Sequence, residues 1–152
     1  MALAHSYSAV KDFENCPRKY HEVRVLKKFK SQDTTATLYG TAVHSAFEHF
    51  IKDRTPLPER FANYKPFVEP LAAFDGDIRC EEKMAIRADF TPCEFFDKDV
   101  WFRGIPDYLA ISKSGRTARV ADYKTGKSSR FADTAQLELM AAMIMLHHPA
   151  VD

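Results

Sequence analysis

The residues in this sequence best suited to chemistry are acids set into apolar strands, with a lysine beside one of them. In "RVADYKTGK", Asp122 stands two positions before Lys124, and residues two apart on a strand share a face. In "GIPDYLAI" and "IRCEEKMAIR" the same period places Asp107 and Glu82 on apolar rows, with Glu81 facing outward. Three adjacent strands would therefore each supply one carboxylate to one apolar face of a sheet.

Carboxylates gathered in this way favour a bound cation. Burying unpaired carboxylates costs several kcal/mol each, and three of them would repel one another strongly at neutral pH. Lys124 can balance only one of them. Oxygen ligands suit Mg²⁺ or Mn²⁺, whereas zinc would prefer clustered cysteine and histidine ligands, which this sequence lacks. Alternatively, the acids lie at strand ends and are solvated by water.

A histidine on an amphipathic segment is a further candidate ligand. Between about residues 37 and 52, apolar residues recur at helical spacing, and a spacing of four places His44 and Glu48 on one face. A histidine in this position is either a metal ligand or a satisfied group of the core or surface. The spacing alone leaves both interpretations open.

The elements that must position these residues follow from changes in the hydrophobic period. Capping residues and prolines predict helices over about 8–15 (with Ser8 as N-cap), 37–52, 59–74 and 133–148. Alternation of apolar and polar residues, or β-branched and aromatic residues, predicts strands in 78–87, 100–112 and 117–125. The turn "KSGR" joins the last two strands. This order predicts an α/β fold with an α+β-like arrangement, in which a mixed central sheet is flanked by helices.

Composition limits the protein classes. The 152 residues fit one domain, 1–152, and the 45% of apolar and 28% of charged residues are typical of globular proteins. The absence of a secretory signal and of a long apolar run predicts a cytoplasmic protein without membrane contact. Three widely spaced cysteines predict reduced thiols. A net charge of +1 provides no global attraction to nucleic acid.

Local basic segments could supply that attraction. "RKYHEVRVLKKFK" holds six Lys or Arg residues among thirteen, and it is either a solvated face or a phosphate-binding patch. Phosphate contacts would come from Arg18, Lys19, Lys27, Lys28, Lys127 or Arg130. Tyr20, Phe29, Trp101 and Phe102 would either stack on bases or, as we favour, belong to the core.

Taken together, the motifs resemble a known family. "PD" at 106–107, followed after fourteen residues by "DYK", is similar to the signature of the PD-(D/E)XK nuclease superfamily, which has a restriction-endonuclease-like core. "CPRKY" (16–20), "GTAVHSAFE" (40–48), "GIPD" (104–107) and "DYKTG" (122–126) resemble its RecB-like branch in order. That branch includes AddB-like and CRISPR-adaptation nucleases and phage recombination exonucleases.

The resemblance implies roles for the matching positions. It implies Mg²⁺ or Mn²⁺ held by His44, Asp107, Asp122 and the backbone carbonyl of Tyr123. Lys124 would position the attacking water and stabilise charge on the scissile phosphate, and Glu82 is a candidate carboxylate. Gln136 would orient the site or contact DNA, but with Asp133 it also has the spacing of a helix capping box. Arg18, Lys19, Tyr20, Lys127 and Arg130 are the nucleic-acid contacts we expect.

The implied function is metal-dependent hydrolysis of DNA, most naturally as an exonuclease in recombination, repair or phage DNA processing. Three departures bear on it. Met140 stands where the family helix often has a tyrosine. Iron-sulfur members of the family have a cysteine near position 16 and three more near the C-terminus; only Cys16 matches, so we expect no iron-sulfur cluster. The chain also stops before the family's last strand and helix, as in a truncated or naturally short version. The open sheet edge would favour self-association or a protein partner.

Two other classes remain open at this point. One is a catalytically silent module of the same fold that binds nucleic acid or a partner. The other is a metal-dependent phosphohydrolase that acts on free nucleotides.

Overall fold

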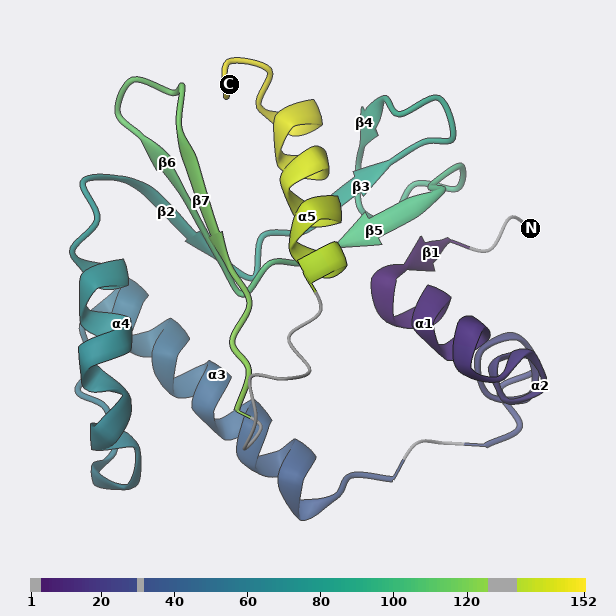
Figure 1. The fold of residues 1–152 in the computed structure, drawn as a ribbon, viewed down its shortest axis with the longest axis horizontal. Coiled ribbons are helices and arrows are strands. Elements are labelled where there is room, and N and C mark those ends of the chain that lie inside the picture. Colours follow the sequence, from purple (N-terminus) through teal and green to yellow (C-terminus); the bar gives the residue numbers. More distant parts are fainter. Residues whose placement is uncertain (1–3, 30–31, 126–133) are drawn as a thin grey trace.

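The computed structural model describes residues 4–29, 32–125 and 134–152, and it has the predicted α/β class (Figure 1). The α-helices are α1 (Tyr7–Asn15), α2 (Pro17–Tyr20), α3 (Thr35–Asp53), α4 (Lys65–Ala72) and α5 (Thr134–His147). The strands are β1 (His5–Ser6), β2 (Gly76–Cys80), β3 (Met84–Ile86), β4 (Pro92–Cys93), β5 (Phe102–Gly104), β6 (Tyr108–Ser112) and β7 (Ala118–Ala121). A π-helical turn spans His21–Val25 and a 3₁₀ helix spans Glu59–Tyr64.

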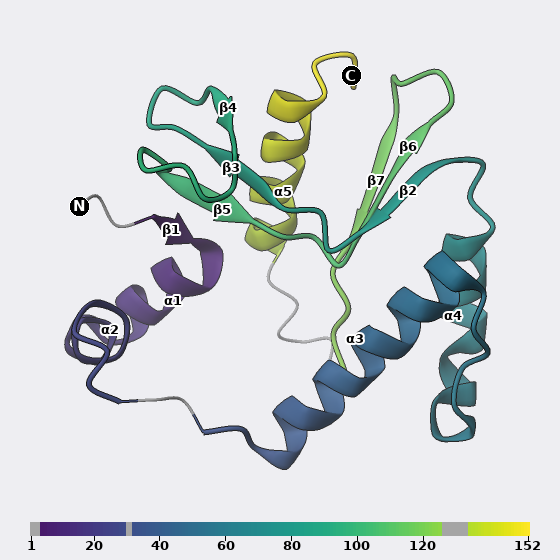
Figure 2. The same cartoon turned by 180° about the vertical axis from the view of Figure 1, so that it is seen from behind.

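The strands form two sheets rather than one continuous central sheet. One sheet has the order β1-β5-β3-β4, and the other has the order β2-β6-β7. The pair β1–β5 is parallel and the other pairs are antiparallel, so the first sheet is mixed as expected. The two sheets diverge on either side of α5 in both ribbon views (Figures 1 and 2).

The division arises because a long hairpin bends in its middle. The predicted continuous strands over 78–87 and 100–112 are wrong, since each is interrupted, at 81–83 and at 105–107. Glu81 has a φ of 56°, which is outside the strand region, and Pro106 has no N–H to donate to the ladder. The register does not change across the bend: Cys80 is paired with Tyr108 before it and Met84 with Gly104 after it.

Helix α3 begins and ends at well-defined caps. Thr34 and Thr37 form a reciprocal capping box at its start, and Arg54 ends it in the left-handed conformation. The predicted apolar stripe is buried at Val43, Phe47 and Ile51, which pack with α4 and with Tyr108 of β6. This packing fixes the face of α3 from which His44 projects.

The segment predicted as one helix over 59–74 is divided. Residues Glu59–Tyr64 are 3₁₀, and α4 begins at Lys65 with Pro66 in its first turn, where a missing N–H costs nothing. At the N-terminus, α1 is capped by Ser6 rather than by the predicted Ser8.

Helix α5 fills the space between the two sheets. Met140, Met143 and Ile144 are buried in one cluster with residues of β3, β5 and β6. A Cβ added to Gly104 would lie 2.9 Å from Met143 Sδ and 3.0 Å from Met140 Sδ, so glycine allows the close approach of this helix. In the described part of the chain, no helix is long and apolar enough to cross a membrane.

Candidate functional site

Three acids stand in one cross-strand row at the ends of β2, β6 and β7. Tyr108 is paired with Cys80 on one side and with Ala121 on the other. One residue further along each strand stand Glu81, Asp107 and Asp122; Glu81 and Asp107 belong with His44 to one group of possible metal ligands, whereas Asp122 does not. The N–H of Glu81 lies 3.4 Å from the carbonyl oxygen of Asp107. Adjacent strands therefore do supply one carboxylate each, as the sequence predicts, but just beyond the paired residues.

The acid contributed by the first strand is Glu81 and not Glu82. Glu82 accepts a hydrogen bond from Arg79 at 3.2 Å, and it lines a separate cavity with Lys83 and Cys93. The sequence predicts Glu82 on the inward row and Glu81 outward; in the structure Glu81 is exposed but lies with His44 and Asp107, because the strand is interrupted at residues 81–83. Directly opposed residues of an antiparallel pair share a face of the sheet. Knowing which residue of the first strand lies opposite Asp107 would therefore have identified Glu81.

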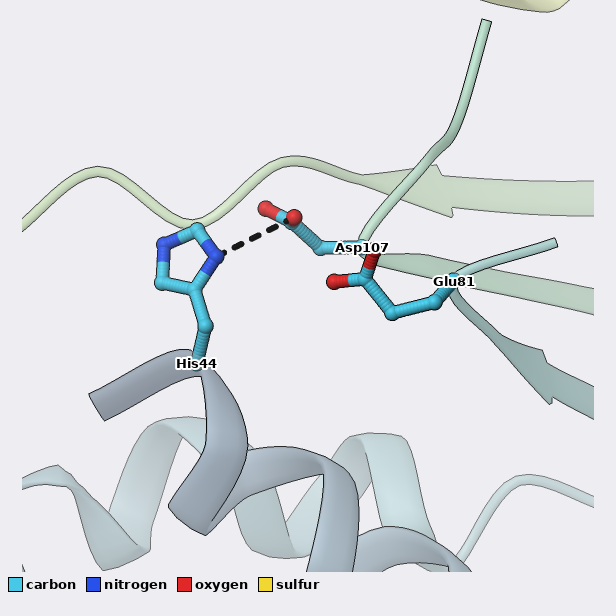
Figure 3. A group of neighbouring side chains, drawn as sticks. All are labelled: His44, Glu81 and Asp107. Carbon is cyan, nitrogen blue, oxygen red and sulfur yellow. Dashed lines mark ion pairs between the residues drawn. The ribbon is translucent and has the colours of Figure 1, made fainter. Parts of the chain in front are cut away.

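His44, Glu81 and Asp107 converge from a helix and two strand ends (Figure 3). Each offers a ligand atom, and these atoms all lie within 4.8 Å of one another. His44 Nδ1 is 3.1 Å from Asp107 Oδ1, the contact that is dashed in Figure 3. The other ring nitrogen, Nε2, is 2.9 Å from the carbonyl oxygen of Tyr123.

The electrostatics of this cluster follow from its contacts. Both ring nitrogens of His44 face oxygen acceptors, so the hydrogen bond with Asp107 raises the pKa of His44 more than burial lowers it. The pKa of Glu81 is also raised, first by partial desolvation and then by the negative charges of Asp107 and Glu48. A positive charge at this position, whether on His44 or on a metal ion, would offset the negative charges of Asp107 and Glu81.

Tyr123 holds the backbone between the acids. Its N–H donates to Asp107 Oδ2 at 2.5 Å, which ends the β7 ladder before Asp122 instead of continuing it to residue 125 as predicted. Its ring packs edge-on against Phe47, with centroids 4.9 Å apart. Burial raises the pKa of the Tyr123 phenol well above its usual range. The carbonyl oxygen of Tyr123 is thereby fixed toward His44.

Asp122, Lys124 and Gln136 form a second, adjoining group. The Gln136 amide donates to Asp122 Oδ1 at 2.9 Å, and its oxygen accepts from Lys124 Nζ at 3.1 Å. Lys124 also forms an ion pair with Asp122. The Gln136 side chain therefore connects the acid and the lysine. Asp133, its partner in the alternative capping box, lies outside the described residues.

The donor set fits a hard divalent cation. The side chains of Asp107 and Asp122 are only 12% and 16% exposed. Asp122 Oδ2 is buried and accepts no hydrogen bond of regular geometry; its contact is the ion pair with Lys124. The available donors are carboxylates, one backbone carbonyl and one imidazole, with no cysteine in the described cluster, so Mg²⁺ or Mn²⁺ suits it better than zinc.

Among the described residues, the expected nucleic-acid contacts Arg18, Lys19 and Tyr20 are not brought to this site. Arg18 and Lys19 are exposed on α2, which lies away from the junction of α3 with β6 and β7 in both views (Figures 1 and 2). Tyr20 packs edge-on against Phe13, with centroids 5.6 Å apart. Lys127 and Arg130 lie outside the described residues.

The departure at Met140 has a structural reason. Met140 is 7% exposed, and its sulfur packs over Gly104. This position of α5 packs into the core here. Cys16 is exposed and caps α2, whereas Cys80 is buried and Cys93 is half-buried on β4.

A comparison with known protein families identifies the family of this chain. The family model described as the PD-(D/E)XK nuclease superfamily matches residues 4–151. Neither the curated proteins nor the solved structures yielded a match.

Proposed function

Because the chain belongs to the PD-(D/E)XK nuclease superfamily, we propose that it hydrolyses phosphodiester bonds of DNA with Mg²⁺ or Mn²⁺, as an exonuclease of the RecB-like branch. Recombination, repair or phage DNA processing would use such an activity. The single observation that supports this proposal best is the row of Glu81, Asp107 and Asp122 beside Lys124. A single domain over 1–152 is part of the same proposal.

The acids and the Tyr123 carbonyl would hold the cation, together with His44. A divalent ion at this position polarises the phosphate and lowers the pKa of bound water. Asp107 is oriented for this task by His44 on one oxygen and by the Tyr123 N–H on the other. Glu81, which is exposed, would adjust its position most easily when a cation binds.

Lys124 is placed to act on the substrate. Its side chain is 55% exposed, and its ammonium group is held by Gln136 and Asp122. A cation held in this way faces the negative charge that develops on a phosphate during hydrolysis. We assign Gln136 to positioning, because it touches both Lys124 and Asp122.

The test is degradation of end-labelled single- and double-stranded DNA with Mn²⁺, Mg²⁺ or a chelator. We expect metal-dependent release of nucleotides, lowered by roughly 10²- to 10³-fold in Lys124→Ala, the scale for loss of one charge-stabilising group. Lys113→Ala is the matched control, since Lys113 is exposed on the β6–β7 turn and pairs with Asp75. Its rate should equal that of the native chain.

Two results would replace this function. DNA binding without metal-dependent cleavage would indicate a catalytically silent module. Release of phosphate from free nucleotides, with DNA left intact, would indicate a nucleotide phosphohydrolase.

A further inference from the structure

Strand β7 forms one edge of the sheet β2-β6-β7, and half of its backbone groups point away from its neighbour. Among the described strands it pairs with β6 alone. In an antiparallel pair, alternate residues turn their N–H and C=O groups toward the partner strand, and the residues between turn them outward. Ser112 N–H donates to the carbonyl oxygen of Thr117 at 2.9 Å, which sets this alternation. Ala118 and Val120 therefore present outward groups, with which no described backbone group pairs.

Helices cover both faces of this sheet. Ala118 and Val120 pack, with Leu109 of β6, in the cluster that contains the buried residues of α5. Ala121 packs on the other face, in the cluster of α3 and α4. Both ribbon views show α5 on one side of the β6–β7 hairpin and α3 below it (Figures 1 and 2). A further segment can therefore be added to β7 only along its edge.

The other sheet edges carry features that hinder the addition of a strand. Strand β1 has only two residues. On β4, Pro92 has no N–H, and its carbonyl oxygen accepts a hydrogen bond from Arg87 at 3.1 Å. On β2, Asp77 and Arg79 form an ion pair at 2.7 Å, and charged edge residues discourage pairing. Strand β7 has neither a proline nor a balanced pair of charges.

The charge at the β7 edge is positive. Arg119 is exposed, its guanidinium carbon lies 4.8 Å from the centroid of the Phe74 ring, and no described carboxylate lies at ion-pair distance from it. If two copies of β7 paired through Ala118 and Val120 of both copies, each Arg119 would stand opposite its counterpart. Like charges directly opposite each other are destabilising. The edge thus disfavours a second copy of this chain and favours an acidic segment.

The chain's own Asp152 shows the contacts that such a segment would make. Its N–H donates to the carbonyl oxygen of Arg116 at 2.9 Å, and its carboxylate forms an ion pair with the Arg116 side chain. Arg116 stands two residues before Ala118, so its carbonyl oxygen belongs to the same outward-facing set. A backbone hydrogen bond and an Asp–Arg ion pair therefore already occur together at one end of this edge.

We propose that the β7 edge binds an extended acidic segment of a partner protein by strand addition. The backbone of the segment pairs with the N–H and C=O groups of Ala118 and Val120, and an aspartate or glutamate of the segment pairs with Arg119. In this mode of recognition the backbone hydrogen bonds give affinity and the side chains give specificity. The sugar–phosphate backbone of DNA has no N–H donors for these carbonyl oxygens. The inference does not depend on the proposed nuclease activity.

Two synthetic peptides test the proposal. Both alternate valine and threonine, and one has a central aspartate where the other has a central lysine. Each is added to the isotope-labelled full chain, and NMR follows the backbone amide signals of Ala118 and Val120. We expect the aspartate peptide to shift both signals and to bind about 2- to 5-fold more tightly than the lysine peptide, the scale of an exposed ion pair. Unshifted signals, or equal affinity of the two peptides, would overturn the proposal.

Two substitutions separate the side-chain contact from the backbone contact. Arg119→Glu changes an exposed residue and should make the lysine peptide the tighter ligand. Val120→Pro removes an outward N–H and leaves the bonds to β6 in place, so it should weaken binding of both peptides. Ile78→Pro is the matched control, because Ile78 holds the equivalent outward position on β2 and lies outside the β7 edge. Its peptide affinities should equal those of the native chain.

Three results would contradict strand addition at β7. One is full peptide affinity in a folded Val120→Pro, and another is a preference for aspartate that persists in Arg119→Glu. The second result decides the matter even where Val120→Pro does not fold, which thermal unfolding shows. The third is a shift of the Ala118 and Val120 signals with protein concentration in the absence of peptide, which would assign the edge to a second copy of this chain.

Discussion

Replacing Glu81 by glutamine tests the cross-strand row most directly, because it should change metal-free stability and metal affinity in opposite directions. The ligand atoms of Glu81 and Asp107 lie within 4.8 Å. Two like unit charges at that distance repel by about 1 kcal/mol at the dielectric constant of water. Glu81 is exposed, so this solvent-screened value is the appropriate one.

His44 makes this effect depend on pH. When the ring is protonated, its attraction for Glu81 offsets the repulsion from Asp107, since its ligand atom lies within the same 4.8 Å. We therefore expect Glu81→Gln to stabilise the metal-free protein by about 1 kcal/mol near pH 9 and by almost nothing near pH 6. Urea unfolding in chelator at the two pH values measures this difference.

The same substitution should weaken Mn²⁺ binding by about tenfold or more, measured by titration calorimetry near pH 7.5. Glu82→Gln is the matched control: it breaks an exposed pair with Arg79, costs about 0.2–1 kcal/mol of stability, and should leave Mn²⁺ affinity unchanged. If Glu82→Gln instead lost the metal while Glu81→Gln kept it, the register argument would be refuted.

Three further substitutions test the surroundings of the site. The pKa of His44 is raised in the folded protein, so His44 stabilises the metal-free fold fully at pH values below its unfolded pKa, and this stabilisation is lost as pH rises through its higher folded pKa. His44→Gln should abolish this loss of stability above pH 6.5, measured by urea unfolding. Gly104→Ala should cost about 1–3 kcal/mol in thermal unfolding, because its Cβ meets the sulfur of Met143. Gln136→Ala should lower the cleavage rate and shift its pH profile, since Lys124 loses a partner; an unchanged profile would assign Gln136 a structural role.

Local patterns in the sequence predicted which of several side chains lie close together. The spacing of two predicted that Asp122 lies beside Lys124, and these two side chains form an ion pair, although β7 ends at Ala121. Helical spacing placed His44 on α3, and its ring contacts Asp107. Such patterns are readable because a side chain's direction along one strand or helix depends on its immediate neighbours.

The choice of Glu81 over Glu82 was decided by tertiary structure. It depends on which residue of β2 pairs with Tyr108, and on the positive φ that lets the chain bend at residue 81. Register is a property of two strands, and a slip of one residue reverses every face, so one strand's pattern cannot determine it. The same holds for Lys83 and Arg103: their sequence says that they are cations, but only the packed chain places Arg103 over the Phe95 ring and Lys83 over the Phe96 ring.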